Sequence, residues 1–346
     1  MKMNRYIMGS IDTFGCNLKC TYCFYNQVTG YEHKKQTFRY SIEQMKQAMT
    51  TERLGGVCHI SLCGDGETLL DYQVVELAKA LLENGHVISI VTNGTLSVRL
   101  QELCELLTEN EKKRCMIVFS LHYLELVRLN KLNEYFSNMR FMHENGFSVR
   151  SSLVLCDEYI ECIEEIKKVC MENLGFLPRV SVVRDQNDDQ KIMTKYDIEE
   201  YKKIGREFNS PAFDFSFEMS NKKQNGFCYA GIWTFNLNFS TGIMRQCLGN
   251  SMPQNIFENP SEPIQFIPVG NNCKMPWCVC YQFQNYGVIP EESYPDERAM
   301  FSEESQKWVS DEIWEYTSGK LTETNRQFTQ EEKDMINQAY RNLGLA

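Results

Sequence analysis

Cys16-Asn17-Leu18-Lys19-Cys20-Thr21-Tyr22-Cys23 places three thiols at spacings of four and three residues, directly after a short apolar run. Thiols this close together on one loop form a facial set of soft ligands. Soft ligands select zinc, copper(I) or an iron–sulfur cluster rather than magnesium or calcium. A four-iron cluster with only three protein ligands keeps one iron open for a small molecule. The stretch therefore predicts a soft-metal site around which the rest of the chain is organised.

Two other interpretations of the stretch are a structural zinc loop and three unrelated buried thiols. Zinc knuckles normally pair two Cys-x-x-Cys units, or combine one such unit with histidines. Within twenty residues of the last cysteine, the chain offers only His33. The ligand spacing therefore favours an iron–sulfur cluster.

The same spacing, with Tyr22 directly before the last cysteine, resembles the signature of the radical S-adenosylmethionine family. The resemblance implies that Cys16, Cys20 and Cys23 hold a four-iron cluster whose open iron chelates the amine and carboxylate of S-adenosylmethionine. It also implies that an electron cleaves a carbon–sulfur bond, and that the resulting adenosyl radical abstracts hydrogen from a substrate. A flavodoxin- or ferredoxin-type electron donor is an implied partner.

Length and composition set broad limits on the protein. The 346 residues exceed what one core usually supports, so a large domain plus a smaller one is expected. A net charge of −10 argues against nucleic-acid or anionic-membrane partners. No apolar run approaches the roughly 20 residues of a membrane span, and the N-terminus lacks the apolar centre of a secretion signal. These features predict a cytoplasmic protein whose fifteen cysteines are metal ligands and free thiols rather than disulfides.

Apolar, β-rich runs alternate with segments of helical periodicity over the first 210 residues. The expected strands are Arg5–Asp12, Val57–Cys63, His86–Thr92, Cys115–Leu121, Phe147–Leu155 and Arg179–Arg184. The expected helices are Ser41–Leu54, Leu70–Asn84, Ser97–Glu109, Leu124–Asn145, Tyr159–Glu172 and Thr194–Asn209. Such alternation predicts an α/β fold with parallel strands and right-handed crossovers, either an open doubly wound sheet or a partial barrel. The family resemblance implies a (β/α)6 partial barrel with its site at the carboxyl ends of the strands.

The alternation stops near Pro211, where the composition shifts to Phe, Asn, Gly, Pro and Cys. We expect three units: a core at 1–210, a small cysteine-rich α+β module at 211–290, and a helical C-terminal tail at 291–346. Within the tail, helices are expected near Glu303–Thr317 and Thr329–Asn342.

A glycine-rich turn follows the second expected strand, at Cys63-Gly64-Asp65-Gly66-Glu67-Thr68. Glycines let backbone approach a ligand closely, and a carboxylate beside them can help to hold an ammonium group. In the resembling family a glycine-glycine-glutamate turn at this point holds the amine of S-adenosylmethionine. The resemblance therefore implies this role for Gly64, Gly66 and Glu67. The chain departs from the family in having Asp65 between the glycines and Thr68 where proline is frequent.

Polar residues at the ends of the later strands are further candidates for cofactor binding. Asn93 follows the third strand, and Ser120 and His122 end the fourth. In the family a serine and an aspartate near the fourth strand bind the cofactor, so Ser120 matches and His122 departs. Ser152 on the fifth strand and Arg184 after the sixth are additional candidates, since arginine can hold a carboxylate bidentately. Structural roles are the alternative for His122, as a turn histidine, and for Arg184, as a partner of Asp185.

A second set of cysteines begins with Cys228, which is followed by Gly242 and then Cys247. This order resembles the opening of the SPASM and twitch extensions, which carry auxiliary iron–sulfur clusters. The segment Trp233–Phe239 with its Ser-Thr-Gly turn is expected to form a hairpin. Three more candidate ligands follow, so that five thiols can fill one auxiliary four-iron cluster with one left over: Cys273, Cys278 and Cys280. The alternative for these thiols is a zinc site.

The remaining cysteines divide into two groups. Most lie inside expected elements and are interpreted as small buried hydrophobes: Cys58, Cys104, Cys115, Cys162 and Cys170. Cys63 and Cys156 lie at strand ends that should face the pocket, and a thiol there can donate a hydrogen atom to a substrate radical. Burial for packing is the competing interpretation of both.

The expected activity is hydrogen abstraction from a peptide or protein, leading to crosslinking, epimerisation or oxidation. The aromatic-rich second module favours a long substrate. The first strand begins almost at once, at Arg5, without a preceding leader-binding module, which argues the other way. Oxidation or epimerisation of a small sugar or cyclitol is the alternative within the family. A non-enzymatic metal-binding or electron-carrier protein is the alternative from another class.

Overall fold

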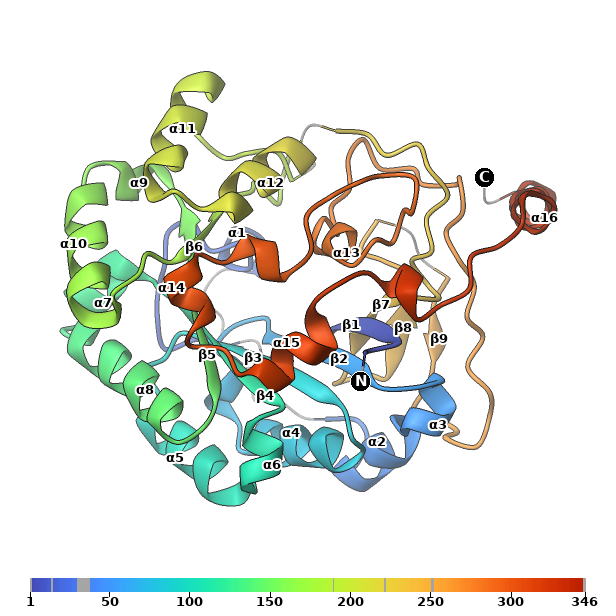
Figure 1. Ribbon diagram of the computed structural model, residues 1–346, viewed down its shortest axis with the longest axis horizontal. Coiled ribbons are helices and arrows are strands. Elements are labelled where there is room, and N and C mark those ends of the chain that lie inside the picture. The colour runs from blue at the N-terminus through green and yellow to red at the C-terminus, as the bar shows by residue number, and fades with distance from the viewer. Residues whose placement is uncertain are drawn as a thin grey trace.

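The computed structural model describes residues 2–13, 15–29, 38–188, 190–220, 222–249 and 252–344. A nine-stranded sheet forms the centre of this described part, in the order β6-β5-β4-β3-β2-β1-β7-β8-β9. The sheet curves around an interior space, and helices cover its outer face (Figure 1). Because its two edge strands do not pair with each other, the barrel is partial.

The six strands expected from the sequence are all present, and each is parallel to the next. Their bounds are β1 Arg5–Ile11, β2 Cys58–Gly64, β3 Val87–Thr92, β4 Cys115–Ser120, β5 Ser148–Leu155 and β6 Arg179–Val182. Sequential parallel strands with intervening helices confirm the α/β partial-barrel prediction.

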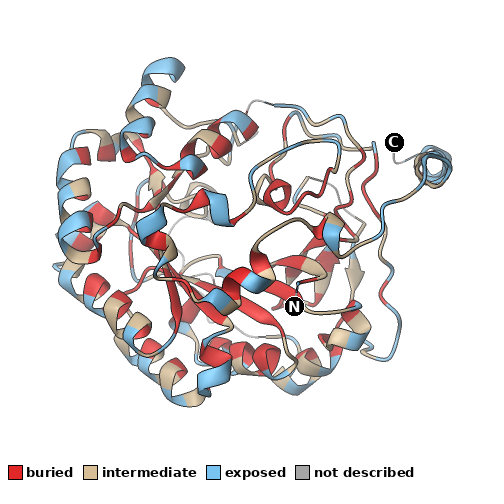
Figure 2. Ribbon diagram, viewed as in Figure 1, coloured by how far each residue is buried: buried red, intermediate tan, exposed pale blue. Residues whose placement is uncertain are grey.

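Most of the expected long helices are split into two. The observed pieces are α2 Ile42–Ala48, α3 Thr51–Leu54, α4 Gln73–Glu83, α5 Ser97–Leu106, α6 Glu109–Lys112, α7 Tyr123–Arg128, α8 Leu132–Glu144, α9 Asp157–Ile160, α10 Ile163–Leu174 and α11 Ile198–Gly205. The breaks have local causes: Thr50 and Thr108 accept hydrogen bonds from the backbone N–H groups of new helices, and Asn130 has a φ of 55°. Each longer helix turns its apolar stripe towards the sheet and leaves its polar face in solvent (Figure 2).

Helix α12 (Pro211–Met219) lies beyond the point where the alternation was expected to stop. It packs along β6, the edge strand of the sheet. Serine hydroxyls accept hydrogen bonds from backbone N–H groups of β6: Ser210 from Val180 at 2.9 Å and Ser216 from Val182 at 3.3 Å. The helix therefore shields an edge that would otherwise expose unpaired donors, and the barrel unit extends past residue 210.

The expected hairpin is present as β7 (Thr234–Asn238) and β8 (Ile243–Arg245), which pair antiparallel and lead to the short β9 (Gln254–Asn255). Gly242 supplies the positive φ of the turn, 76°. Strand β7 also pairs in parallel with β1. The cysteine-rich segment is therefore joined to the barrel through one continuous sheet.

The helices of the C-terminal segment are α13 Gln282–Asn285, α14 Glu303–Gln306, α15 Asp311–Thr317 and α16 Gln330–Asn342. The segment crosses the sheet with α14 and α15, whereas its last helix, α16, lies at the edge of the molecule (Figure 1). Phe301 and Trp314 share a buried cluster with Val87 and Met116, at the starts of β3 and β4. The segment therefore closes the amino-terminal end of the barrel. In the described part of the chain, no helix is both long and apolar enough to cross a membrane.

Candidate functional site

A cavity of about 530 Å³ occupies the interior of the partial barrel. Inward-facing side chains of β1 to β6 form its wall, and the cysteine loop after β1 covers it at the carboxyl ends of the strands. Parallel α/β folds generally place their ligand sites at this end of the sheet.

The three thiols of the loop, Cys16, Cys20 and Cys23, all line this cavity. The loop is fastened to the helices that follow β4 and β5: Glu125 of α7 accepts a hydrogen bond from the Lys19 backbone N–H at 2.8 Å, and Glu158 of α9 accepts one from the Thr21 hydroxyl at 3.0 Å. These contacts hold the thiols over the interior.

Donors around Cys16 are oriented towards its sulfur. The Leu18 backbone N–H lies 3.4 Å from Cys16 Sγ, and the Asn93 side-chain amide lies 3.8 Å from it. Burial raises the pKa of Cys16 to about 11, and burial also raises the pKa of Cys20. Because a buried thiolate is penalised in the metal-free loop, a cationic metal centre is what would make the ionised form favourable here.

The glycine-rich turn after β2 is docked directly on the cysteine loop. A Cβ atom on Gly66 would stand 1.7 Å from the carbonyl oxygen of Gly15. That same carbonyl accepts a hydrogen bond from the Glu67 backbone at 2.9 Å. The contact between the two loops therefore requires a glycine at position 66. Gly64 and Gly66 also line the cavity, where their backbone faces a ligand.

Glu67 lies elsewhere than the family resemblance implied. Its side chain is buried and is absent from the cavity wall. The carboxylate accepts hydrogen bonds from the Thr92 hydroxyl at 2.6 Å, the Asn93 backbone at 2.7 Å and the Leu69 backbone at 3.0 Å. These bonds tie the turn after β2 to the end of β3 and occupy the carboxylate with donors of the protein itself.

Asp65 is the acid of this turn that faces the cavity. Its carboxylate accepts a hydrogen bond from the Tyr25 hydroxyl. Burial, reinforced by the nearby Asp12 and opposed by the Tyr25 bond, raises the pKa of Asp65 to about 6. A cationic group placed next to Asp65 would favour its ionised form.

Tyr22 and His122 meet at the cavity wall. The Tyr22 hydroxyl lies 2.8 Å from His122 Nδ1 and 2.7 Å from the Tyr159 hydroxyl. Burial lowers the pKa of His122 to about 4, so its imidazole is neutral at pH 7. The pair presents a neutral, hydrogen-bonded surface beneath the cysteine loop.

The other strand-end candidates divide between the cavity wall and the surrounding layer. Ser120, Ser152 and Arg184 line the cavity. Asn93 is buried behind the cysteine loop, where its amide donates to Asn17 at 2.7 Å as well as approaching Cys16. Arg184 lies over the Tyr281 ring, with 4.7 Å between its guanidinium carbon and the ring centroid.

The two candidate hydrogen-donor thiols differ in their surroundings. Cys63 lines the cavity, and burial raises its pKa to about 12, which keeps it a thiol. Cys156 is 1% exposed and is not among the lining residues. The expectation that it faces the pocket is wrong because β5 ends at Leu155 and the chain turns there into α9.

The lining residues that were not expected include four polar or charged ones: Tyr6, Arg150, Arg179 and Glu297. Arg150 and Arg179 alternate with serines along β5 and β6, and this period-two polar pattern in a buried parallel sheet was a signal for an interior cavity. Glu297 lies far along the chain, and only the path of the C-terminal segment brings it here.

The second set of cysteines surrounds a separate cavity of about 30 Å³, lined by Cys228, Cys247, Cys273, Cys278 and Cys280. Cys228 has electrostatic contacts with Cys247, Cys273 and Cys278, and Cys280 has such contacts with Cys247 and Cys278. Cys280 also lines the main cavity. Among the described residues, no group of three or more His, Cys, Asp or Glu side chains is arranged to hold a single metal ion.

Comparison with known proteins is consistent with this geometry. Residues 10–170 match the model of the radical SAM superfamily. Streptococcus suis SuiB bound to S-adenosylmethionine superposes with a TM-score of 0.53 at 20% identity, over 74% of this chain and 64% of SuiB. SuiB bound to its precursor peptide SuiA gives a TM-score of 0.54 at 18% identity, over 75% of this chain and 64% of SuiB.

Native anSMEcpe with bound AdoMet gives a TM-score of 0.53 at 17% identity, over 92% of this chain and 98% of that one. At these identities the likeness shows the fold. The chain spans less than two thirds of the length of SuiB. No curated protein sequence matches the chain.

Proposed function

We propose that this chain is a radical SAM enzyme, as the match of residues 10–170 to that superfamily suggests, and that it abstracts hydrogen from a peptide substrate. The observation that carries the proposal is the arrangement of one cavity. Cys16, Cys20 and Cys23 cover it, the Gly64–Gly66 turn borders it, and its interior, mostly apolar with a few polar side chains, leaves room for a substrate.

The family uses a four-iron cluster and S-adenosylmethionine, and the residues present fit both. Cys16, Cys20 and Cys23 provide three soft ligands, which leaves one iron open. The Leu18 backbone and the Asn93 amide donate towards Cys16 Sγ and would stabilise it as a thiolate. When bound, the cluster and S-adenosylmethionine supply a 5′-deoxyadenosyl radical that takes a hydrogen atom from the substrate.

We assign the holding of S-adenosylmethionine to residues on the cavity wall. The Gly64 and Gly66 backbone and the Asp65 carboxylate would receive the amine, since Glu67 is occupied by its own hydrogen bonds. Ser120, Ser152 and Arg184 are candidates for the ribose and carboxylate. Tyr22 and His122 would shape the wall, while Asn93 and Glu67 position the loops from behind.

We further propose that Cys228, Cys247, Cys273 and Cys278 hold one auxiliary four-iron cluster. Electrostatic contacts among these four thiols support the set, and Cys280 is left out because it borders the main cavity as well as the small one. One cluster with one thiol left over matches the shorter, twitch-type extension.

The peptide assignment has two supports. SuiB and anSMEcpe, which share this fold, have each been seen with a peptide bound. The cavity of about 530 Å³ is also large enough for a side chain with its flanking backbone. Crosslinking, epimerisation and oxidation are all compatible with this assignment.

Anaerobic reconstitution followed by reduction tests the proposal. We expect about eight iron atoms per chain, by four-iron cluster arithmetic, and release of 5′-deoxyadenosine. Triple replacement of Cys16, Cys20 and Cys23 by Ala should remove about half of the iron and all cofactor cleavage. A replacement at the surface, Arg206→Gln, serves as the matched control and should retain both.

Substrate class is tested separately, with peptides encoded near the gene and with amino sugars as competitors. A peptide that gains or loses hydrogen, detected by mass spectrometry, supports the proposal. Turnover of an amino sugar with no peptide modified would replace it by small-molecule dehydrogenation. A reconstituted protein that never cleaves S-adenosylmethionine would instead be an electron carrier.

A further inference from the structure

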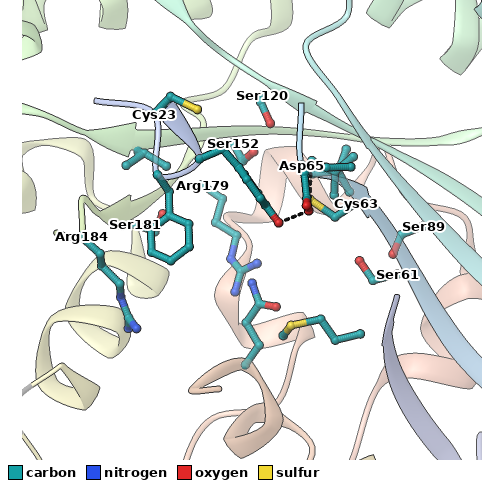
Figure 3. Close-up of a pocket in the computed structure, with 18 of the residues that line it drawn as sticks. Cys23, Ser61, Cys63, Asp65, Ser89, Ser120, Ser152, Arg179, Ser181 and Arg184 are labelled. Carbon is teal, nitrogen blue, oxygen red and sulfur yellow. Dashed lines mark hydrogen bonds between the residues drawn. The ribbon is translucent and has the colours of Figure 1, made fainter. Parts of the chain in front are cut away.

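The deeper half of the cavity carries charge that the cofactor sites do not use. Arg150 and Arg179 project into it from the early parts of β5 and β6. Their register places Arg179 beside Ser152, which in turn is beside Ser120. Figure 3 shows the Arg179 guanidinium in the middle of the pocket, between serines of β2 and β3 on one side and Ser181 on the other.

A single carboxylate serves both arginines. Glu297 Oε1 lies 2.8 Å from Arg150 Nη1 and 3.6 Å from Arg179 Nη1. The side chains of Arg150, Arg179 and Glu297 are 12%, 11% and 8% exposed, so solvent screens this group little. Two guanidinium cations against one carboxylate leave a net charge of about +1 in the cavity.

Arg150 and Arg179 do not share this carboxylate equally. Arg150 makes the short bond and packs its guanidinium against the Phe301 ring, 5.4 Å from the ring centroid. Arg179 has the longer ion pair and, among the described residues, no hydrogen bond to its guanidinium. Arg150 is therefore held as part of the barrel wall, and Arg179 keeps free donors that face the cavity.

The neighbouring polar groups do not neutralise the excess charge. Tyr6 and Tyr286 stack with 4.5 Å between ring centroids, and burial raises the pKa of both, which keeps them neutral. His59 is bonded to the Tyr286 hydroxyl at 3.2 Å and to Ser89 at 3.0 Å. Burial lowers the pKa of His59 to about 4, so it adds no charge at pH 7.

Arg179 is also separate from the cofactor end of the cavity. Its electrostatic neighbours are Glu297, Tyr281, Tyr286 and Tyr6, and the last is the second residue of β1. The cysteine loop follows the opposite end of that strand. Arg184 stands beyond the end of β6 and contacts the Val279 carbonyl at 3.5 Å, which leaves it as the arginine nearer the mouth.

We propose that Arg179, assisted by the hydroxyl of Ser181, binds a carboxylate of the peptide substrate. The inference rests on the proposed peptide function and adds that the peptide must carry a carboxylate at this position. A planar guanidinium pairs bidentately with a carboxylate. The single negative charge of a carboxylate also balances the excess of about +1, whereas a phosphate dianion would overshoot it.

Binding to the reconstituted, unreduced holoenzyme in the presence of S-adenosylmethionine tests the inference by calorimetry. One probe is acetyl-glycyl-aspartyl-glycinamide, and its neutral match has asparagine at the centre. A third probe, acetyl-triglycine with a free C-terminus, separates a terminal carboxylate from a side-chain carboxylate. Glucose phosphate represents small phosphorylated substrates.

We expect at least one carboxylate probe to bind tenfold or more tightly than the neutral peptide, whose Kd sets the baseline. Arg179→Gln should weaken that probe by roughly 10- to 100-fold, the usual loss for a charge-assisted hydrogen bond. Arg179→Lys should retain part of the affinity, and Arg206→Gln at the surface should retain all of it. The affinity for S-adenosylmethionine should be the same in all four proteins.

Three results would overturn the inference. If the wild-type protein binds the acidic and neutral peptides equally, or binds neither, it has no preference for a carboxylate. This result needs no variant. If glucose phosphate binds more tightly than the peptides, the ligand of Arg179 is a phosphate and not a peptide carboxylate. A parallel loss of S-adenosylmethionine affinity in Arg179→Gln assigns the arginine to the cofactor. Because the protein stays unreduced, these results are independent of whether it cleaves S-adenosylmethionine.

Discussion

The carbonyl oxygen of Gly15 lies 1.7 Å from the point at which a Cβ atom on Gly66 would stand. The turn after β2 and the cysteine loop after β1 therefore meet backbone to backbone. The two loops therefore support each other's position, although about fifty residues of sequence separate them.

Gly66→Ala is expected to displace the cysteine loop, because the new methyl group meets backbone atoms that cannot rotate away. We expect a loss of about 1–3 kcal/mol in the free energy of unfolding, together with reduced iron at the first site. Chemical denaturation and iron analysis measure the two effects. Gly175→Ala is the control: its left-handed backbone should cost about 1–2 kcal/mol, but its Cβ meets no atom within 4 Å and the iron should be retained. Full iron in Gly66→Ala would contradict the argument.

Binding of S-adenosylmethionine should weaken in acid because of Asp65. Burial raises the pKa of this carboxyl to about 6 in the free protein, so protonation below pH 6 removes the charge that would attract the cofactor's ammonium group. The affinity should fall roughly tenfold per pH unit below pH 6 and level off above it. Equilibrium dialysis between pH 5 and 8 measures the profile. Asp65→Asn should bind weakly at every pH, while the surface variant Asp214→Asn should reproduce the wild-type curve.

Cys280→Ala and Cys278→Ala should differ in iron content. In the proposed ligand set Cys278 is a ligand and Cys280 is not, since Cys280 also borders the main cavity. Cys278→Ala is expected to hold about four fewer iron atoms than the wild type, and Cys280→Ala the full complement. Iron analysis with electron paramagnetic resonance of the reduced proteins measures this. The reverse pattern would move Cys280 into the ligand set.

Glu297→Gln should destabilise the barrel strongly, because it leaves Arg150 and Arg179 buried without a counter-charge. Breaking one side of a buried charge group typically costs about 3–5 kcal/mol. Glu164, whose side chain is 80% exposed in its pair with Lys167, provides the matched control, and Glu164→Gln should change stability by less than about 0.5 kcal/mol. Denaturant titration of both variants measures the difference. Similar small losses in both would show that the buried group is solvated.

Local sequence patterns were sufficient for the elements of the barrel. Apolar β-branched runs and helical periodicity predicted six strands and their intervening helices, because each pattern reflects contacts within a few residues. The helix breaks at Thr50 and Asn130 were missed. A single capping residue or a single positive φ interrupts a helix, but it leaves the apolar periodicity on both sides unchanged. Helix α12 was missed because its phenylalanines resemble the composition of the module that follows.

The candidate site was predicted in part. The thiols of the cysteine loop, Ser120, Ser152 and Arg184 lie on the cavity wall, where their positions at strand ends suggested. Glu67 and Cys156 do not, because the direction of a side chain at the end of a strand depends on the turn that follows it. Hydrogen bonds from β3 capture Glu67, and the start of α9 turns Cys156 away.

The sequence by itself determined the chemistry of the cysteine loop and the order of strands and helices, since spacing and periodicity are properties of neighbouring residues. Only the tertiary structure decided which acid of the glycine-rich turn faces the cavity, that five thiols surround a second cavity, and that Glu297 reaches two arginines on β5 and β6. These depend on contacts between residues far apart in the chain. The path of the C-terminal segment is what brings Glu297 to the two arginines.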